Sequence, residues 1–159
     1  MSVRVELTRG YFAMVDEADA DRVMQHKWRV MLAPNTAYAV RTMPFINGRR
    51  PVQLMHRFIL GVDLLPTLVD HRDSNGLNNC RSNLRLATFT QNMANSRQLA
   101  RTITGFKGVG FNRRINRYHA KISANGKRRY LGSFTTPEAA HAAYQRAAFE
   151  LFGEFARFE

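Results

Sequence analysis

The chain has 159 residues, of which 45% are hydrophobic, and it carries a formal net charge of +12. This composition excludes a disordered chain, and no apolar run approaches the roughly 18 residues of a membrane span. The single cysteine, Cys80, excludes an internal disulfide bond and a zinc site built from several thiolates. No charged start leads into an apolar segment, so we expect no secretory leader and a cytoplasmic protein. A strongly basic chain favours polyanionic partners, with nucleic acid first.

The first part of the chain shows short strand and helix patterns. They predict strands at 3–7, 11–15 and 38–43, helices at 19–27 and 55–60, and a hairpin turn at Asn47-Gly48. Acidic residues cluster at Asp16, Glu17, Asp19 and Asp21. We interpret this cluster as a helix N-terminus or a solvated face, because helix starts favour negative charge.

The segment 68–95 reads as strand, loop, strand and helix. An apolar run ends in Asp70 and His71, a polar loop follows, and a brief second strand comes next. Thr88 or Thr90 can cap the helix that ends the segment.

These residues resemble the HNH nuclease family, in the variant found in phage and intron-encoded homing endonucleases. The resemblance covers about residues 1–98 and is strongest over 54–95. The matching elements are Met55-His56-Arg57, Asp70-His71, Asn78-Asn79, Ser82-Asn83-Leu84-Arg85, and Thr88 with Gln91-Asn92. The resemblance implies a ββα-metal finger.

The resemblance also implies a role for each residue. It assigns His71 as the general base, Asp70 and Asn92 as ligands of one divalent cation, and Asn83 as the residue that orients the loop or the histidine. A neutral imidazole can take a proton from water at cellular pH, and a hard cation can stabilise the leaving oxygen. One carboxylate and one amide favour Mg²⁺ or Mn²⁺, and no zinc is expected.

Two points stay open at this stage. An Asp-His pair in a polar loop is by itself typical of a surface, and adjacent strand residues point to opposite faces. Asp70 and His71 can therefore share a site only at a strand end where the chain turns. His56, next to Arg57, either contacts the DNA backbone or is a helix-face histidine with satisfied partners.

The last third of the chain is more basic, with nine basic and no acidic residues from Arg101 to Pro137. Its patterns predict strands at 108–114, 117–123 and 128–133, a hairpin turn at Asn125-Gly126, and a helix at 137–151 that begins with a Thr135–Glu138 capping box. Alternation places Val109, Phe111, Tyr118, Ala120 and Ile122 under the helix. The opposite face then carries Gly108, Gly110, Asn112, Arg114, Arg117, His119, Lys121, Ser123, Arg128 and Tyr130.

This segment resembles an AP2/ERF DNA-binding domain. The matching residues are Gly108-Val109, Ala120-Lys121-Ile122, Tyr130-Leu131-Gly132-Ser133-Phe134 and Ala143-Tyr144. In that family three strands lie in the major groove of DNA, which admits such a sheet. The resemblance implies DNA contacts by Lys107, Gly108, Gly110, Asn112, Arg114, Lys121, Ser123, Arg128 and Tyr130. Gly110, Asn112 and Ser123 stand where plant members usually have Arg, so their base preference does not transfer.

The sequence thus predicts an α+β chain with three parts. Residues 1–98 form an HNH nuclease domain with a β-rich N-terminal extension and a ββα-metal core at about 54–98, residues 99–104 a linker, and residues 105–159 an AP2/ERF-like sheet packed on one helix. The expected function is a Mg²⁺-dependent homing-type endonuclease acting on double-stranded DNA in a bacterial or phage-infected cell. We expect a monomer, with a dimer as the alternative, and no membrane or obligate protein partner. The rival interpretations are a non-catalytic DNA-binding regulator and an RNA-binding protein.

Overall fold

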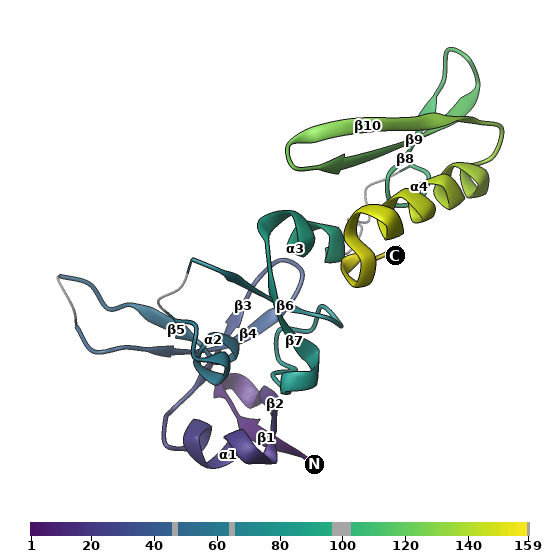
Figure 1. The fold of residues 1–159 in the computed structure, drawn as a ribbon. Helices are drawn as coiled ribbons and strands as arrows, with labels where there is room; N and C mark the ends of the chain where they lie inside the picture. The colour runs from purple at the N-terminus through teal and green to yellow at the C-terminus, as the bar shows by residue number, and fades with distance from the viewer. Residues whose placement is uncertain (46–47, 64–65, 97–102, 159) are drawn as a thin grey trace. The chain divides into compact units, whose positions relative to one another are not determined.

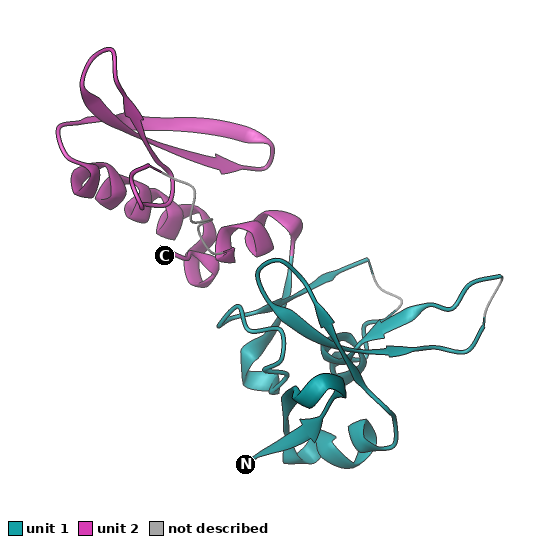
Figure 2. Ribbon diagram, turned by 180° about the vertical axis from the view of Figure 1, so that it is seen from behind, with its two compact units in different colours: residues 1–87 teal, residues 88–159 magenta. Residues whose placement is uncertain are grey.

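The computed structural model describes residues 1–45, 48–63, 66–96 and 103–158. The chain divides into two compact units, Met1–Ala87 and Thr88–Glu159, which Figure 2 colours separately. Both combine helices with small antiparallel sheets, so the fold is α+β, as predicted (Figure 1). None of the helices in the described ranges has the length and hydropathy needed to span a membrane.

The first unit contains three small antiparallel sheets with the strand orders β1-β2, β3-β4-β5 and β6-β7. Its elements are β1 (Ser2–Glu6), β2 (Phe12–Asp16), α1 (Glu17–Met24), β3 (Arg29–Leu32), β4 (Ala37–Thr42), β5 (Val52–Leu54), α2 (Met55–Leu60), β6 (Leu68–His71) and β7 (Leu84–Ala87), with short 3-10 turns η1 (Thr8–Gly10) and η2 (Arg81–Asn83). Every predicted strand and helix of this region is present, except that the first helix begins and ends earlier than predicted. The turn predicted at Asn47-Gly48 includes a residue outside the described ranges.

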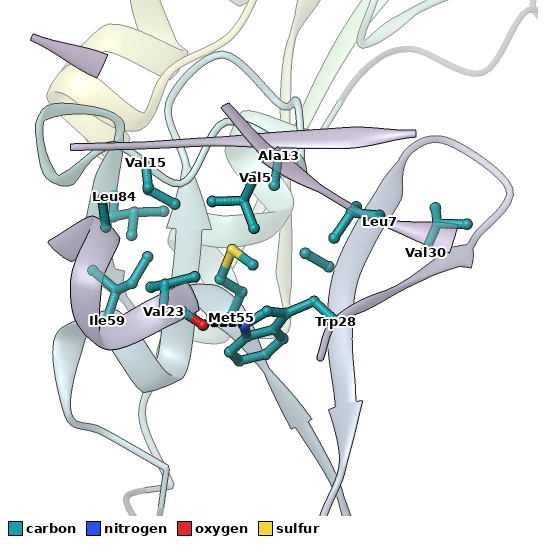
Figure 3. Close-up of a cluster of buried hydrophobic side chains, with 12 residues drawn as sticks. Val5, Leu7, Ala13, Val15, Val23, Trp28, Val30, Met55, Ile59 and Leu84 are labelled. Atoms are coloured by element: carbon teal, nitrogen blue, oxygen red, sulfur yellow. Dashed lines mark hydrogen bonds between the residues drawn. The ribbon is translucent and has the colours of Figure 1, made fainter. Parts of the chain in front are cut away.

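The core of the first unit joins α1, α2 and the strands of β1-β2 (Figure 3). Met55 and Ile59 of α2 are almost completely buried beside Val23 of α1. The indole Nε1 of Trp28 donates a hydrogen bond to the carbonyl oxygen of Val23 at 2.8 Å. Burial of Met55 fixes the first turn of α2, and with it the position of the next residue, His56.

An ion-pair network around the buried carboxylate of Asp19 connects α1 to the segment before β7. Asp19 accepts hydrogen bonds from Nε and a terminal nitrogen of Arg81 at 2.7 and 2.8 Å, and from Arg22 at 3.1 Å. The Arg81 hydrogen bond lowers the pKa of Asp19 below its ordinary value, although burial opposes this shift. The acidic cluster therefore lies at the start of α1, as interpreted from the sequence, and Asp19 has a structural role.

The second unit packs helices against one face of a three-stranded antiparallel sheet with the order β10-β9-β8. Its elements are α3 (Phe89–Asn95), β8 (Val109–Asn112), β9 (Arg117–Ala124), β10 (Lys127–Phe134), α4 (Pro137–Phe152) and the 3-10 turn η3 (Gly153–Phe155). Small buried residues of α4, Ala140 and Ala148, allow the helix to approach Ala120 of β9 closely. The turn between β9 and β10 has positive φ at Asn125 and Gly126, as an Asn-Gly hairpin requires.

The grouping of elements differs from the predicted boundary near residue 98. α3 contacts α4 and η3, and it belongs to the C-terminal unit. The linker predicted at 99–104 lies mostly outside the described residues, so this division of the chain into domains stays a prediction.

The capping box predicted for the last helix is wrong by one residue. Thr136 is the N-cap of α4, and its hydroxyl accepts a hydrogen bond from the Ala139 N–H at 3.2 Å. Pro137 occupies the first turn, as predicted, but the residue three beyond the cap is an alanine, which cannot complete a box.

The neighbouring threonines give a matched stability test of this cap. Thr136→Ala should lower the free energy of unfolding by about 1 kcal/mol, because an N–H group of the first turn loses its acceptor. Thr135→Ala, at an exposed position outside the helix, should change it by less than about 0.5 kcal/mol. Urea denaturation of both variants measures the difference, and equal effects would contradict the assignment of the cap.

Candidate active site and nucleic-acid interface

The β6–β7 hairpin presents the two residues with the strongest predicted roles. Asp70 pairs across the hairpin with Arg85, and His71 pairs with Leu84. β6 ends at His71, where the chain turns and the Ser74 N–H donates to the His71 carbonyl oxygen at 2.9 Å. This is the strand end that the sequence argument required for Asp70 and His71.

Asp70 forms a buried ion pair. Nε of Arg85 donates to Oδ2 of Asp70 at 2.7 Å, and the two side chains are 7% and 5% exposed. Burial lowers the pKa of His71, and the charge of Asp70 is one of the smaller effects that oppose this shift. Burial and, to a smaller extent, the charge of Asp70 raise the pKa of Tyr38. These effects place the carboxylate in the same electrostatic environment as both rings.

The orientation of His71 is set by Asn79. The side-chain Oδ1 of Asn79 lies 3.3 Å from Nε2 of His71, while its Nδ2 donates to the Leu77 carbonyl oxygen at 3.2 Å. Because the amide nitrogen is used toward Leu77, the oxygen faces the imidazole and accepts a hydrogen bond from it. Nε2 therefore carries the proton, and Nδ1 is the nitrogen that can accept one.

Two aromatic residues from other elements pack around His71. The rings of His56 and His71 meet edge to face with centroids 4.8 Å apart, and Tyr38 of β4 lies 5.8 and 6.1 Å from them. Burial lowers the pKa of His71. Burial, with the charges of His71 and Arg57, lowers the pKa of His56 to about 3. Both imidazoles are therefore neutral at cellular pH, the state that a general base requires.

The loop between β6 and β7 is held by Asn83. Its Nδ2 donates to Oδ1 of Asp73 at 2.9 Å and to the Asn78 carbonyl oxygen at 2.8 Å, and its Oδ1 accepts from the Asp73 N–H at 3.1 Å. Burial alone would raise the pKa of Asp73, but hydrogen bonds from the Asn75 N–H and from Asn78 and Asn83 lower it. Asn83 thus orders the loop that contains Asn79.

The neutral, buried state of His56 has a consequence for acid stability. Its folded-state pKa of about 3 lies below the ordinary value of 6.5, so the unfolded chain binds more protons between these values. The free energy of unfolding should therefore fall as pH drops below 6.5, by about 1.4 kcal/mol per pH unit for each such proton, and level off near pH 3.

The variant His56→Gln isolates this contribution, because glutamine does not titrate. Urea denaturation between pH 7.5 and pH 4 should give a shallower loss of stability for His56→Gln than for the parent chain. The difference between the two slopes cancels the titration of the carboxylates, which both proteins share. Parallel slopes would show that His56 is protonated equally well in the folded and unfolded states.

The predicted catalytic residues are distributed over both units. Asp70, His71 and Asn83 come together on the β6–β7 hairpin and its loop in the first unit, whereas Asn92 lies on α3 in the second. Asn92 as a metal ligand therefore stays a prediction. Among the described residues, no group of three or more His, Cys, Asp and Glu side chains is arranged to hold a metal ion.

Of the two oxygen donors assigned by the sequence, Asp70 lies in the first unit and is of the kind that a hard divalent cation takes. A carboxylate has about four lone-pair sites, so the bond from Arg85 to one oxygen of Asp70 is compatible with a cation on the same group. An amide oxygen from Asn92 is a second donor of the same kind. Mg²⁺ usually takes only one or two protein carboxylates and fills its other positions with water and phosphate oxygens.

His56 and Arg57, the two residues suggested as contacts of the DNA backbone, have contacts within the first unit. His56 is 5% exposed and packs between the rings of Tyr38 and His71. Arg57 donates to the carbonyl oxygens of Thr67, at 2.7 Å, and Val62. These contacts brace the chain between α2 and β6, and we do not place His56 in a DNA-contacting set.

Sequence reasoning missed Asn79 and Tyr38 as site residues. Asn79 is fully buried and contacts the imidazole directly, whereas Asn83 was given the orienting role for either the loop or the histidine. The Asn78-Asn79 pair was noticed as a family match, and burial of its second member was the missing information. Tyr38 comes from a distant strand, and only the tertiary fold brings it to His71.

The open face of the β10-β9-β8 sheet carries the side chains predicted for it. Across the sheet, Lys121 pairs with Tyr130 and Ser123 with Arg128. These four side chains are exposed, as are Asn112 of β8 and Arg114 in the following turn. The Arg114 N–H donates to Oδ1 of Asn112 at 3.1 Å, which orders the start of that turn.

Two residues predicted for the open face are directed elsewhere. The Lys107 ammonium donates to the carbonyl oxygens of Ala94 and Ser96 at 2.6 and 2.7 Å, and burial, with the charge of Arg157, lowers its pKa to about 8. A Cβ atom on Gly108 would lie 2.1 Å from the Tyr144 ring, so this glycine faces α4. Alternation failed for Gly108 because this residue precedes β8, outside the regular strand, whereas the DNA contact of Lys107 was implied by the family resemblance.

The chain is similar in sequence to proteins of viruses. No family model and no solved structure matches it. It is 42% identical over 109 residues to a protein of Acanthamoeba polyphaga mimivirus named an uncharacterized HNH endonuclease, a match that covers 64% of this chain and 54% of the relative. The chain thus spans about half the length of that relative.

A second relative comes from a bacteriophage. Protein 3.8 of Escherichia phage T7 is 33% identical over 90 residues, which cover 57% of this chain and 74% of that protein. The chain belongs to the family of this phage protein.

Proposed function

We propose that the chain is a metal-dependent, homing-type DNA endonuclease. In this proposal a ββα-metal finger formed by β6, β7 and α3 hydrolyses a phosphodiester bond, and an AP2/ERF-like sheet reads the DNA. The observation that carries the proposal is the state of His71: it is neutral and fixed by Asn79 beside the carboxylate of Asp70. The name of the mimivirus relative, an uncharacterized HNH endonuclease, supports the same reaction class.

His71 acts as the general base in this mechanism. Since Nε2 carries a proton toward Asn79, Nδ1 accepts the proton of the attacking water. The water oxygen bonds to phosphorus, and the bond from phosphorus to the leaving oxygen breaks. Burial of the imidazole keeps it unprotonated before the reaction.

Asp70 and Asn92 would hold Mg²⁺ or Mn²⁺. When bound, the cation supplies Lewis-acid stabilisation of the phosphate and the leaving oxygen. Asn83 holds the loop of Asn79 and thereby preserves the orientation of His71. Arg85 keeps the Asp70 carboxylate in place within the buried hairpin.

The second unit supplies recognition of double-stranded DNA in this proposal. Basic and polar side chains on its open face suit phosphate oxygens and base edges in the major groove. The DNA-contacting set consists of Gly110, Asn112, Arg114, Lys121, Ser123, Arg128 and Tyr130. Lys107 and Gly108 are left out because their contacts lie within the unit.

The test is cleavage of a supercoiled plasmid. The parent chain should convert it to nicked or linear DNA with Mg²⁺ and lose this activity with a chelator, and His71→Ala should be inactive under both conditions. Cleavage that persists in the chelator would contradict the metal dependence.

One observation favours a second candidate, a DNA-binding regulator without catalysis. Arg85 already neutralises Asp70, which reduces the attraction of this carboxylate for a cation. On that interpretation the parent and His71→Ala proteins would bind DNA equally and cleave none of a varied set of DNA substrates.

A further inference from the structure

His119 occupies the centre of the open face, although no family resemblance assigns it a role. It lies on β9, the middle strand of the sheet, opposite Gly110 on β8 and Ser133 on β10. Both neighbours are small, so the imidazole is the largest group in its row across the sheet. In the rows on either side, the same strand carries Arg117 and Lys121.

The imidazole is held against the backbone of β8. A Cβ atom built on Gly110 would lie 2.6 Å from Nε2 and 2.7 Å from Cε1 of His119, closer than real contacts allow. The ring therefore fills the space that any side chain at position 110 would need. Its position depends on a glycine in the neighbouring strand.

His119 differs from its cationic neighbours, Arg117 and Lys121, in its contacts and its charge. Arg117 is tied to β10, since its Nε donates to Oγ of Ser133 at 3.2 Å. Partial burial and the nearby charge of Lys121 lower the pKa of His119 below its ordinary value. At neutral pH the ring thus offers one donor and one acceptor, which suits a base edge better than a phosphate.

We infer that His119 reads a base edge in the major groove and that Gly110 positions its ring for this contact. The inference rests on the proposed function of the sheet as the DNA reader, and it adds a specificity-determining residue to it. Lys121, one row away on the same strand, contributes phosphate neutralisation, which is independent of sequence.

The experiment uses the full chain with His71→Ala, so that DNA is bound without being cut. A preferred duplex is first selected from a random library, and affinities for it and for single-base variants are then measured at several salt concentrations. Adding His119→Ala should reduce discrimination at one base pair by about 10- to 100-fold and leave non-specific affinity nearly unchanged. Adding Lys121→Ala should weaken binding to all duplexes alike and make the salt dependence shallower by about one unit.

Gly110→Ala tests the positioning part. It keeps the imidazole and displaces it, so it should lose discrimination at the same base pair, and the double variant Gly110→Ala/His119→Ala should lose no more than either single one. Thermal unfolding of each variant identifies any loss of fold, and His119→Gln, which keeps a donor and an acceptor, replaces a variant that does not fold.

The outcomes separate the inference from the proposed function. If the His71→Ala chain selects a duplex but the chain with His119→Ala added discriminates as well as it does, the sheet reads DNA without His119, and the inference is overturned. If the His71→Ala chain selects no duplex at all, the proposed reading function fails, and the inference fails with it.

Discussion

Replacement of His71 by alanine should reduce the rate of Mg²⁺-dependent plasmid cleavage by about 100- to 10,000-fold, the usual contribution of a general base. The reason is specific to the geometry. In the proposed mechanism Nε2 is used toward Asn79 and Nδ1 takes the proton of water, for which alanine supplies no substitute. DNA affinity should stay within a factor of about three, because the ring is buried in the first unit.

The control for this experiment is His26→Ala, which removes an imidazole from the same unit. The ring of His26 contacts the rings of Trp28 and Phe58. Among the ring contacts of the described residues, none joins His26 to the β6–β7 hairpin. Its variant should cleave at nearly the parental rate. Equal cleavage by the parent and His71→Ala proteins would assign the general base to another group.

Replacement of Arg85 by methionine should lower the free energy of unfolding by about 3 to 5 kcal/mol. Arg85 and Asp70 are both buried, and removing one partner leaves the other charge without compensation in a medium of low polarity. Exposed ion pairs such as Met1–Glu17 contribute much less, usually under about 1 kcal/mol. Urea denaturation at pH 7 measures the effect.

The double variant Asp70→Leu/Arg85→Met separates the ion pair from the packing. Replacing both charges by apolar groups should restore most of the lost stability, because the cost of desolvating them disappears as well. This variant should not cleave DNA, since it lacks Asp70. If Arg85→Met were as stable as the parent, water would have to reach Asp70, and the pair would not be buried in solution.

Periodicity predicted most of the strands and helices and the two faces of β9, but it did not predict β3 or β5. Alternation along β9 correctly separated Ala120 and Ile122 from Lys121 and Ser123, because a regular strand has only two sides. It failed for Gly108, which precedes β8 and faces α4. A pattern of period two carries no information outside the strand.

The hairpin residues of the candidate site could be predicted, but their partners could not. Asp70 and His71 are adjacent in sequence, and their family match is local. Arg85, Asn79 and Tyr38 act through burial and tertiary contacts, which a single sequence does not reveal. The helix cap at Thr136 was missed for a simpler reason: two threonines precede Pro137, and only backbone geometry distinguishes them.

The attachment of α3 has a practical consequence for protein engineering. The ammonium group of Lys107 binds carbonyl oxygens at the end of this short helix, and α4 with η3 packs against it. A chimera that joined residues 1–98 to a foreign DNA-binding module would keep α3, which contains Asn92, but would remove Lys107, α4 and η3, which contact it. The exchangeable part of the molecule is therefore smaller than its sequence motifs indicate, and a functional swap would graft new side chains onto the open sheet face while keeping Lys107 and the helices beneath.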